Sequence, residues 1–140
     1  MIVASLLDAG ASFDALTDAL ASLSLPGVTA RCEQVRRCGI AARRFCVDVP
    51  PDEQPHRHLP DILAAIEASA LTPRAKQNAC DVFGALGQAE AKVHGVPVEK
   101  VHFHEVGAAD SIFDIVGAAV ALDLLGFGLL LVLLARFGWM

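Results

Sequence analysis

The sequence has few charged residues and no excess of positive charge. Asp, Glu, Lys and Arg make up 19% of its 140 residues, while 54% are hydrophobic, and this composition excludes intrinsic disorder. Only 11 Lys and Arg stand against 16 Asp and Glu, for a net charge of −5. A general nucleic-acid-binding protein needs a basic face, so nucleic acid is not an expected partner. The length suits one domain.

The sequence also lacks a C-x-x-C pair and a secretory leader. Its cysteines stand at positions 32, 38, 46 and 80, and no basic segment, apolar run and cleavage site follow one another at the N-terminus. Reduced thiols and a cytoplasmic location are therefore expected. We expect Cys32 and Cys46 to pack as small apolar residues rather than to bind metal.

No uninterrupted apolar run reaches the roughly 20 residues of a membrane-spanning helix. Asp123 interrupts the apolar stretch over 115–135, where a carboxylate would cost about 2.5 to 3.5 kcal/mol on insertion. The composition favours a buried element or an atypical tail over a membrane anchor. Nothing later in the chain could cover the aliphatic residues 128–135, so self-association is expected.

Residue periodicity predicts helices and one hairpin in the first half of the chain. Residues 2–9 are predicted to form a helix that ends at Gly10, and Ser12 is a cap for the next helix. Over 28–49 apolar and polar residues alternate on either side of Gly39, which predicts a β-hairpin. Five arginines fall in this stretch; a solvated face is favoured over a phosphate-binding patch. They are Arg31, Arg36, Arg37, Arg43 and Arg44.

The second half is predicted to be mostly helical. Residues 59–69 form one predicted helix, and Thr72-Pro73 starts another that Gly95 ends. The second helix is predicted to carry an apolar stripe of Ala79, Val82, Phe83, Leu86 and Val93. An extended piece over 98–104 then leads into a helix over 107–125. The expected fold class is α+β: a mostly helical single domain with a hairpin at about 28–49 and a short strand before the last long helix, which could join the hairpin sheet.

Chemically useful side chains gather where this short strand meets the last helix. On a strand His102 and His104 point to one face and Glu105 to the other, while Asp110 and Asp114 lie four residues apart on a helix. Imidazoles and carboxylates form a ligand set suited to Ni²⁺, Zn²⁺ or Mn²⁺. His102 and His104 are therefore metal-ligand candidates, with Glu105 as a supporting or proton-handling group.

Spacing alone leaves structural alternatives open. A histidine pair is as often a hydrogen-bonded structural element as a ligand set, and acids in a first helical turn interact favourably with the helix dipole. Asp123 and Asp114, inside an apolar run, favour a function at the junction. His58 is expected in a surface loop and His94 at a helix C-terminus.

At this junction the sequence resembles a known family. The block His102-Phe-His-Glu-Val-Gly-Ala-Ala-Asp-Ser-Ile-Phe-Asp-Ile-Val-Gly117 is similar to the signature of the LarC family of nickel insertion proteins. The resemblance extends over His58-Leu-Pro-Asp-Ile62, Leu71-Thr-Pro73, Ala89-Glu-Ala-Lys-Val-His-Gly95 and Leu6-Leu-Asp-Ala-Gly10. It covers roughly residues 1–126, and the tail over 127–140 does not resemble the family.

The resemblance implies a CTP-dependent nickel chelatase. Full-length members insert nickel into a pyridinium bisthiocarboxylic acid mononucleotide and use CTP with Mn²⁺ or Mg²⁺. A leading strand and turn and the CTP-binding half have no counterpart in this sequence, and a long histidine-rich tract is reduced to His56 and His58. We therefore expect part of the N-terminal domain, inactive alone: a natural short protein, a frameshifted fragment, or half of a split pair whose partner chain supplies the CTP domain. The alternatives are a non-catalytic nickel-binding or assembly module and a membrane-anchored fragment.

Overall fold

The computed structural model describes residues 1–51, 57–103 and 107–126. Within these ranges the predicted α+β architecture is confirmed as one small, mostly helical unit with a single hairpin. Its elements are α1 (Ile2–Asp8), α2 (Phe13–Ala21), β1 (Thr29–Arg37), β2 (Ile40–Asp48), α3 (Leu59–Ala68), α4 (Pro73–His94), the 3-10 turn η1 (Val98–Lys100) and α5 (Ala109–Leu124).

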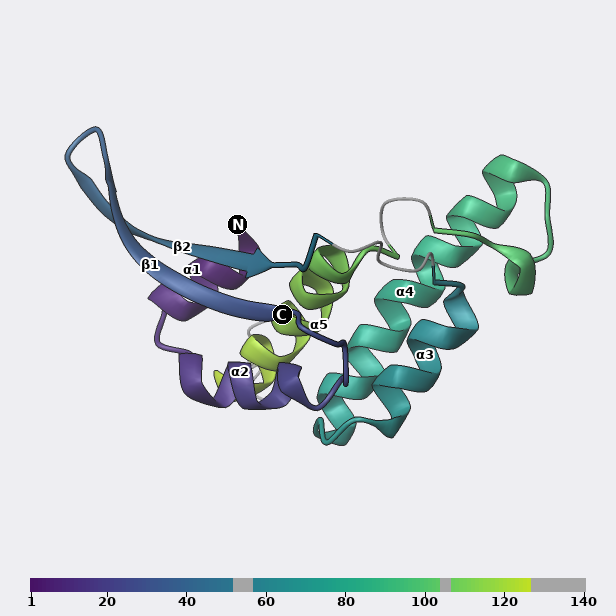
Figure 1. The fold of residues 1–140 in the computed structure, drawn as a ribbon, viewed down its shortest axis with the longest axis horizontal. Coiled ribbons are helices and arrows are strands. Elements are labelled where there is room, and N and C mark those ends of the chain that lie inside the picture. The colour runs from purple at the N-terminus through teal and green to yellow at the C-terminus, as the bar shows by residue number, and fades with distance from the viewer. Residues whose placement is uncertain (52–56, 104–106, 127–140) are drawn as a thin grey trace, which may run out of the picture.

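Helix α5 is the central element of the fold. It contacts α1 and α2 on one side and α4 on the other, and α3 packs against α4 (Figure 1). Phe113 and Val116 of α5 and Phe83 of α4 are almost fully buried in the resulting core. The residues just before α5 are therefore attached to the best-packed part of the molecule.

The predicted helix boundaries are confirmed by their caps. The hydroxyl of Ser12 accepts a hydrogen bond from the backbone N–H of Ala15 at 3.2 Å, and α2 begins at the next residue. Thr72 accepts in the same way from Ala75, ahead of the proline that opens α4. Gly95 ends α4 in the left-handed conformation, with φ of 65°.

The apolar stripe predicted for α4 is wrong at two positions. Val82 is 45% exposed and Val93 is 79% exposed. The buried residues of this helix instead lie four apart, because α3 and α5 cover only one narrow face of it. They are Ala75, Ala79, Phe83 and Gly87.

The hairpin has the predicted turn and two distinct faces. Cys38 and Gly39 both have positive φ, at 49° and 80°, as a tight two-residue turn requires. Ala30 pairs with Val47 and Cys32 with Phe45, and these four side chains pack against the helical core. Cys46, by contrast, pairs with Arg31 and is only half-buried, outside that core.

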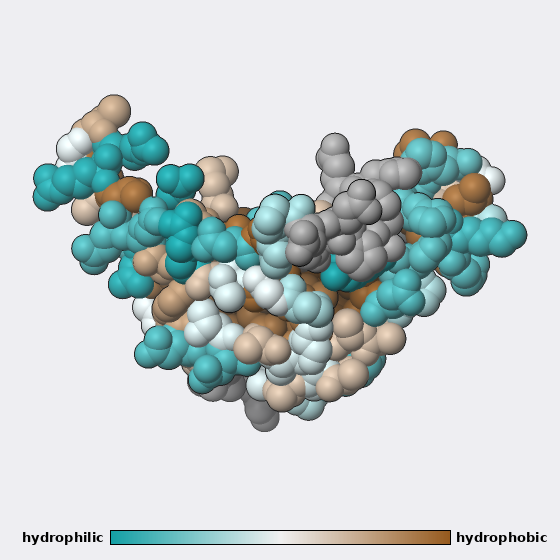
Figure 2. Space-filling model, in the orientation of Figure 1, coloured by the Kyte–Doolittle hydropathy of each residue, from teal (hydrophilic) through white to brown (hydrophobic). Residues whose placement is uncertain are grey.

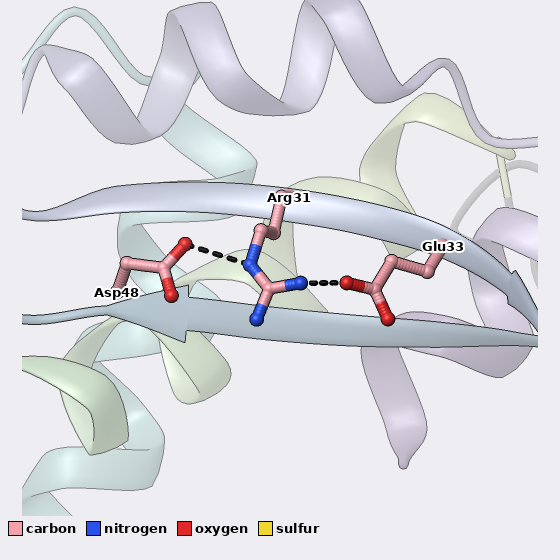
Figure 3. A network of polar contacts seen from close by, with 3 residues as sticks. All are labelled: Arg31, Glu33 and Asp48. Carbon is pink, nitrogen blue, oxygen red and sulfur yellow. Dashed lines mark hydrogen bonds and ion pairs between the residues drawn. The ribbon is translucent and has the colours of Figure 1, made fainter.

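The outer face of the hairpin is polar, as predicted. The Nε of Arg31 donates to Asp48 Oδ2 at 2.8 Å, and its guanidinium also pairs with Glu33 (Figure 3). Where the hairpin extends away from the helices, many of its residues are hydrophilic, although Ile40 at its turn is 71% exposed (Figures 1 and 2). Exposed ion pairs of this kind each contribute about 0 to 1 kcal/mol, so we assign this face to solvation.

The short strand predicted over 98–104 is largely replaced by a turn. Pro97 begins a 3-10 turn in which the N–H of Lys100 donates to the Pro97 carbonyl at 2.9 Å. Beyond it, His102 forms an isolated antiparallel bridge with His58 rather than joining the hairpin. The sheet in the described residues has two strands.

The predicted tail, residues 127–140, lies outside the described residues, as do His104, Glu105 and His56. In the part of the chain that the structure covers, none of the helices combines the length and the apolar character that a bilayer crossing requires.

Candidate functional site

The segment before α5 alternates between buried and exposed side chains. Val101 and Phe103 are each 2% exposed, and the ring of Phe103 lies 6.4 Å from that of Phe83 between centroids. His102, between them, is exposed. Two buried neighbours therefore fix the backbone of His102 and direct its imidazole to the surface.

The structure places His58 against His102. Their ring centroids are 3.8 Å apart, with the ring planes inclined by 51°. His58 directly precedes α3, and its backbone N–H donates to Asp61 Oδ2 at 3.2 Å. His58 was expected in a surface loop; it does lie in the loop before α3, but it is half-buried and in contact with His102.

One sequence signal bears on this pairing. Pro60 in the first turn marks the start of α3, and His58 is its N-cap residue, in the extended conformation usual at that position, with φ of −79° and ψ of 157°. An extended residue can pair with another segment. His58 and His102 are 44 positions apart, however, and neither segment contains a pattern that predicts the other as its partner.

Gly107 permits the close approach of the loop before α3 to the loop before α5. A β-carbon at this position would lie 2.9 Å from the Phe103 carbonyl oxygen and 3.0 Å from that of Arg57. Arg57 Nη1 in turn donates to the carbonyl of Gly107 at 3.4 Å. The glycine thus helps to hold His58 and His102, each adjacent to one of these residues, in contact.

The carboxylates on α5 lie on its first turns, as predicted. Asp110 Oδ1 accepts a hydrogen bond from the N–H of Ser111 at 2.8 Å. Asp114 instead lines a hollow of about 490 Å³ with the apolar side chains of Met1, Ile2 and Val82. Partial burial raises the pKa of Asp114, the negative charge of Asp110 raises it further, and the positive N-terminus lowers it.

Neither carboxylate is joined to the histidine pair. Within the residues described, no hydrogen bond or ion pair connects Asp110 or Asp114 with His58 or His102. Asp123 has a different role from the one expected, because it lies at the opposite end of α5. There its Oδ2 accepts from the hydroxyl of Thr72 at 2.6 Å, and its Oδ1 lies 3.8 Å from Arg74 Nε.

A small hollow adjoins His102 at the C-terminal end of α4. It measures about 180 Å³ and is lined by His94, Val96, Lys100, Val101 and His102. His94 ends α4, as predicted, and its Nε2 lies 3.1 Å from Glu90 Oε2. Two histidines and one lysine thus line the same small space.

Two of the five predicted site residues, His104 and Glu105, belong to the undescribed segment. Among the described residues, no group of three or more His, Cys, Asp and Glu side chains is arranged to hold a metal ion. The described part of the site is therefore a histidine pair, His58 and His102, on two loops that Gly107 brings together. Neutral imidazoles of this kind are ligands for Ni²⁺, Zn²⁺ and Cu²⁺.

Comparison with known sequences gives one consistent result. The sequence profile of a family described as "Nickel insertion protein" matches residues 1–138. A protein of Geotalea uraniireducens is 53% identical over 130 residues, and one of Citrifermentans bemidjiense is 50% identical over 126 residues. A protein of Myxococcus xanthus is 48% identical over 128 residues. Each of the three is named "Putative nickel insertion protein".

These matches cover most of the chain and a minor part of each relative. They span 90% or 91% of this chain but 33% of the relative. The chain therefore spans about one third of the length of the curated relatives that it matches. No solved structure matches the chain.

Proposed function

The chain belongs to the nickel insertion protein family, and from this premise we propose that it holds Ni²⁺ for insertion into a pyridinium bisthiocarboxylic acid mononucleotide. Nickel is here a substrate that passes to an organic acceptor. The family resemblance at residues 102–117 supplies the acceptor's identity. The exposed imidazole of His102, between two buried neighbours, is the observation that carries the proposal.

In this proposal His102 and His104 are nickel ligands. Two neutral imidazoles bind Ni²⁺ and leave coordination positions for water or for the sulfur atoms of an acceptor. Glu105 and Asp110 lie near these ligands in sequence and, with Asp114, are assigned supporting roles. Asp114 is the least well supported of these three assignments, since its side chain lines an apolar hollow.

We assign the CTP-dependent step to a region outside these 140 residues. A triphosphate with Mn²⁺ or Mg²⁺ is normally held by a glycine-rich turn and several cations. The described residues at the junction include the cations Lys100 and Arg57, and they contain no glycine-rich turn. A partner chain or the remaining two thirds of a longer protein would supply this step, and the chain alone would bind nickel without turnover.

A non-catalytic nickel-binding or assembly module is the second candidate. It keeps the same histidines but hands nickel on without taking part in the insertion.

We place either activity in the cytoplasm, because the four cysteines are free thiols. Self-association is proposed from the exposed apolar residues around the N-terminus, Met1, Ile2 and Val82.

A nickel-transfer assay separates the two candidates. The chain loaded with Ni²⁺ is mixed with the acceptor mononucleotide, CTP and Mn²⁺, with or without the missing two thirds of a relative, and nickel-containing product is followed by mass spectrometry. For the insertion function we expect product only when both parts are present. Product at the same rate without this chain would favour the assembly module, and failure of the chain to bind nickel would contradict both.

A further inference from the structure

We propose that His58 and His102 bind one divalent metal ion between them, so that the nickel site includes a histidine from the loop before α3. The inference rests on the proposed function for the identity of the metal. The pairing itself rests on ring centroids 3.8 Å apart and on the antiparallel bridge between the two residues.

Both imidazoles are carried on backbone that is held in place. His58 caps α3, and its N–H is bound to Asp61 Oδ2. His102 lies between two side chains in the core, Val101 and Phe103. The two ligands therefore meet before any ion arrives, and little conformational freedom remains to be lost on binding.

The distance between the rings is close to that of a chelating pair. With metal–nitrogen bonds of about 2.1 Å at a right angle, two imidazole centroids lie about 4.5 Å apart. The observed separation is 3.8 Å, so the two rings are in contact and have to move apart by about 0.7 Å for an ion to bind between them. The exposure of His102 and the half-burial of His58 leave one side of the pair open to solvent.

The surroundings do not complete a closed coordination sphere. Asp61 is engaged with the backbone of His58, and His94 lies within 3.1 Å of Glu90. No third ligand from the described residues joins the pair. Structural metal sites are closed by four protein ligands, whereas a site with open positions can exchange its ion or accept a substrate ligand. A site with two histidine ligands and open coordination positions therefore suits a metal ion that is bound and then transferred.

The test is calorimetric titration of the reduced chain with NiCl₂, using substitutions that preserve the fold. His58→Asn removes the imidazole but keeps an efficient helix cap, and His102→Asn removes an exposed side chain. His94→Asn is the matched control, because His94 lines the neighbouring hollow and belongs to neither loop. We expect each of H58N and H102N to weaken nickel binding about tenfold or more, and H94N to change it less than about twofold.

Thermal melts of the same variants show whether the fold persists, and ¹⁵N imidazole spectra of the wild-type chain with ZnCl₂ identify the bound rings directly. Unchanged nickel affinity in H58N would overturn this inference, and so would zinc-induced shifts that omit His58. Loss of nickel binding in a His102→Ala/His104→Ala variant, with the nickel affinity of H58N unchanged, would overturn this inference and leave the proposed function intact. Unchanged binding in every variant would overturn both.

Discussion

Gly107 lies directly against the carbonyl of Phe103, with room there for a hydrogen atom but not for a methyl group. A β-carbon would lie 2.9 Å from that oxygen and 3.0 Å from the β-carbon of Phe103. Both neighbours are fixed, one being backbone and the other the first carbon of a buried side chain. The close contact determines how the segment before α5 approaches the loop before α3.

Replacing Gly107 by Ala should therefore destabilise the chain by about 1 to 3 kcal/mol, because the backbone has to move to relieve the overlap. Gly84 is the matched control. It lies inside α4, and a β-carbon added there would have no neighbour within 4 Å, so G84A should stabilise by about 0.5 to 1 kcal/mol through helix propensity. Urea unfolding followed by circular dichroism measures both, and equal effects of the two substitutions would refute the steric explanation.

Thr72 connects the start of α4 to the end of α5. Its hydroxyl accepts from the N–H of Ala75 and donates to Asp123 Oδ2. Thr72→Ala should cost about 1 to 2 kcal/mol, since it removes both interactions. Thr72→Ser keeps the hydroxyl and should remain within about 0.5 kcal/mol of the original chain. Thermal melts distinguish these results, and a serine variant as unstable as T72A would show that the methyl group matters instead.

Asp114 should make stability depend on pH. Burial raises its pKa in the folded chain above the ordinary value of 3.8, so the folded state binds this proton more tightly than the unfolded state. The stability that the protonated group contributes is present below pH 3.8 and is lost as the pH rises through the folded-state pKa.

Asp114→Asn should accordingly have a higher melting temperature than the original chain at about pH 7, and the difference should shrink towards about pH 3.5. Asp110→Asn is the control, because it removes one repulsive charge but leaves the burial of Asp114 unchanged. A melting-temperature difference between D114N and the original chain that is constant over this range would contradict the assignment.

Self-association should depend on the apolar surface at the N-terminus. Ile2 is 66% exposed and Val82 is 45% exposed, and both line the hollow of about 490 Å³. We expect the chain to sediment as more than a monomer and an Ile2→Lys/Val82→Lys variant to move towards monomer. Val93→Lys is a control at an exposed valine away from that hollow. A chain that is monomeric before any substitution would contradict this expectation.

Local signals predicted most of the fold. Ser12, Thr72 and Gly95 mark helix ends through hydrogen bonds and conformations that involve only neighbouring residues. Val82 and Val93 were wrongly expected in the core, because helical spacing gives the face of a helix but not how much of that face other elements cover.

The candidate site was harder to predict because it is formed by contacts between distant segments. The alternation of polar and apolar residues over 101–103 agrees with an exposed His102 between buried neighbours, although the sequence left the exposure of His102 open. The contact of His58 with His102 depends on the packing of α3 and α4 and on the space that Gly107 leaves open. None of these tertiary relationships has a signature in either histidine's own segment.

The most direct test of nickel binding at this junction is X-ray absorption at the nickel K edge of the chain loaded with one equivalent of Ni²⁺. Imidazole ligands produce a characteristic outer-shell scattering pattern, in addition to nearest-neighbour nitrogen and oxygen at about 2.1 Å. We predict scattering from at least two imidazoles, reduced in the His58→Asn and His102→Asn variants. A spectrum with oxygen or sulfur ligands alone, unchanged in these variants, would contradict nickel binding by this histidine pair.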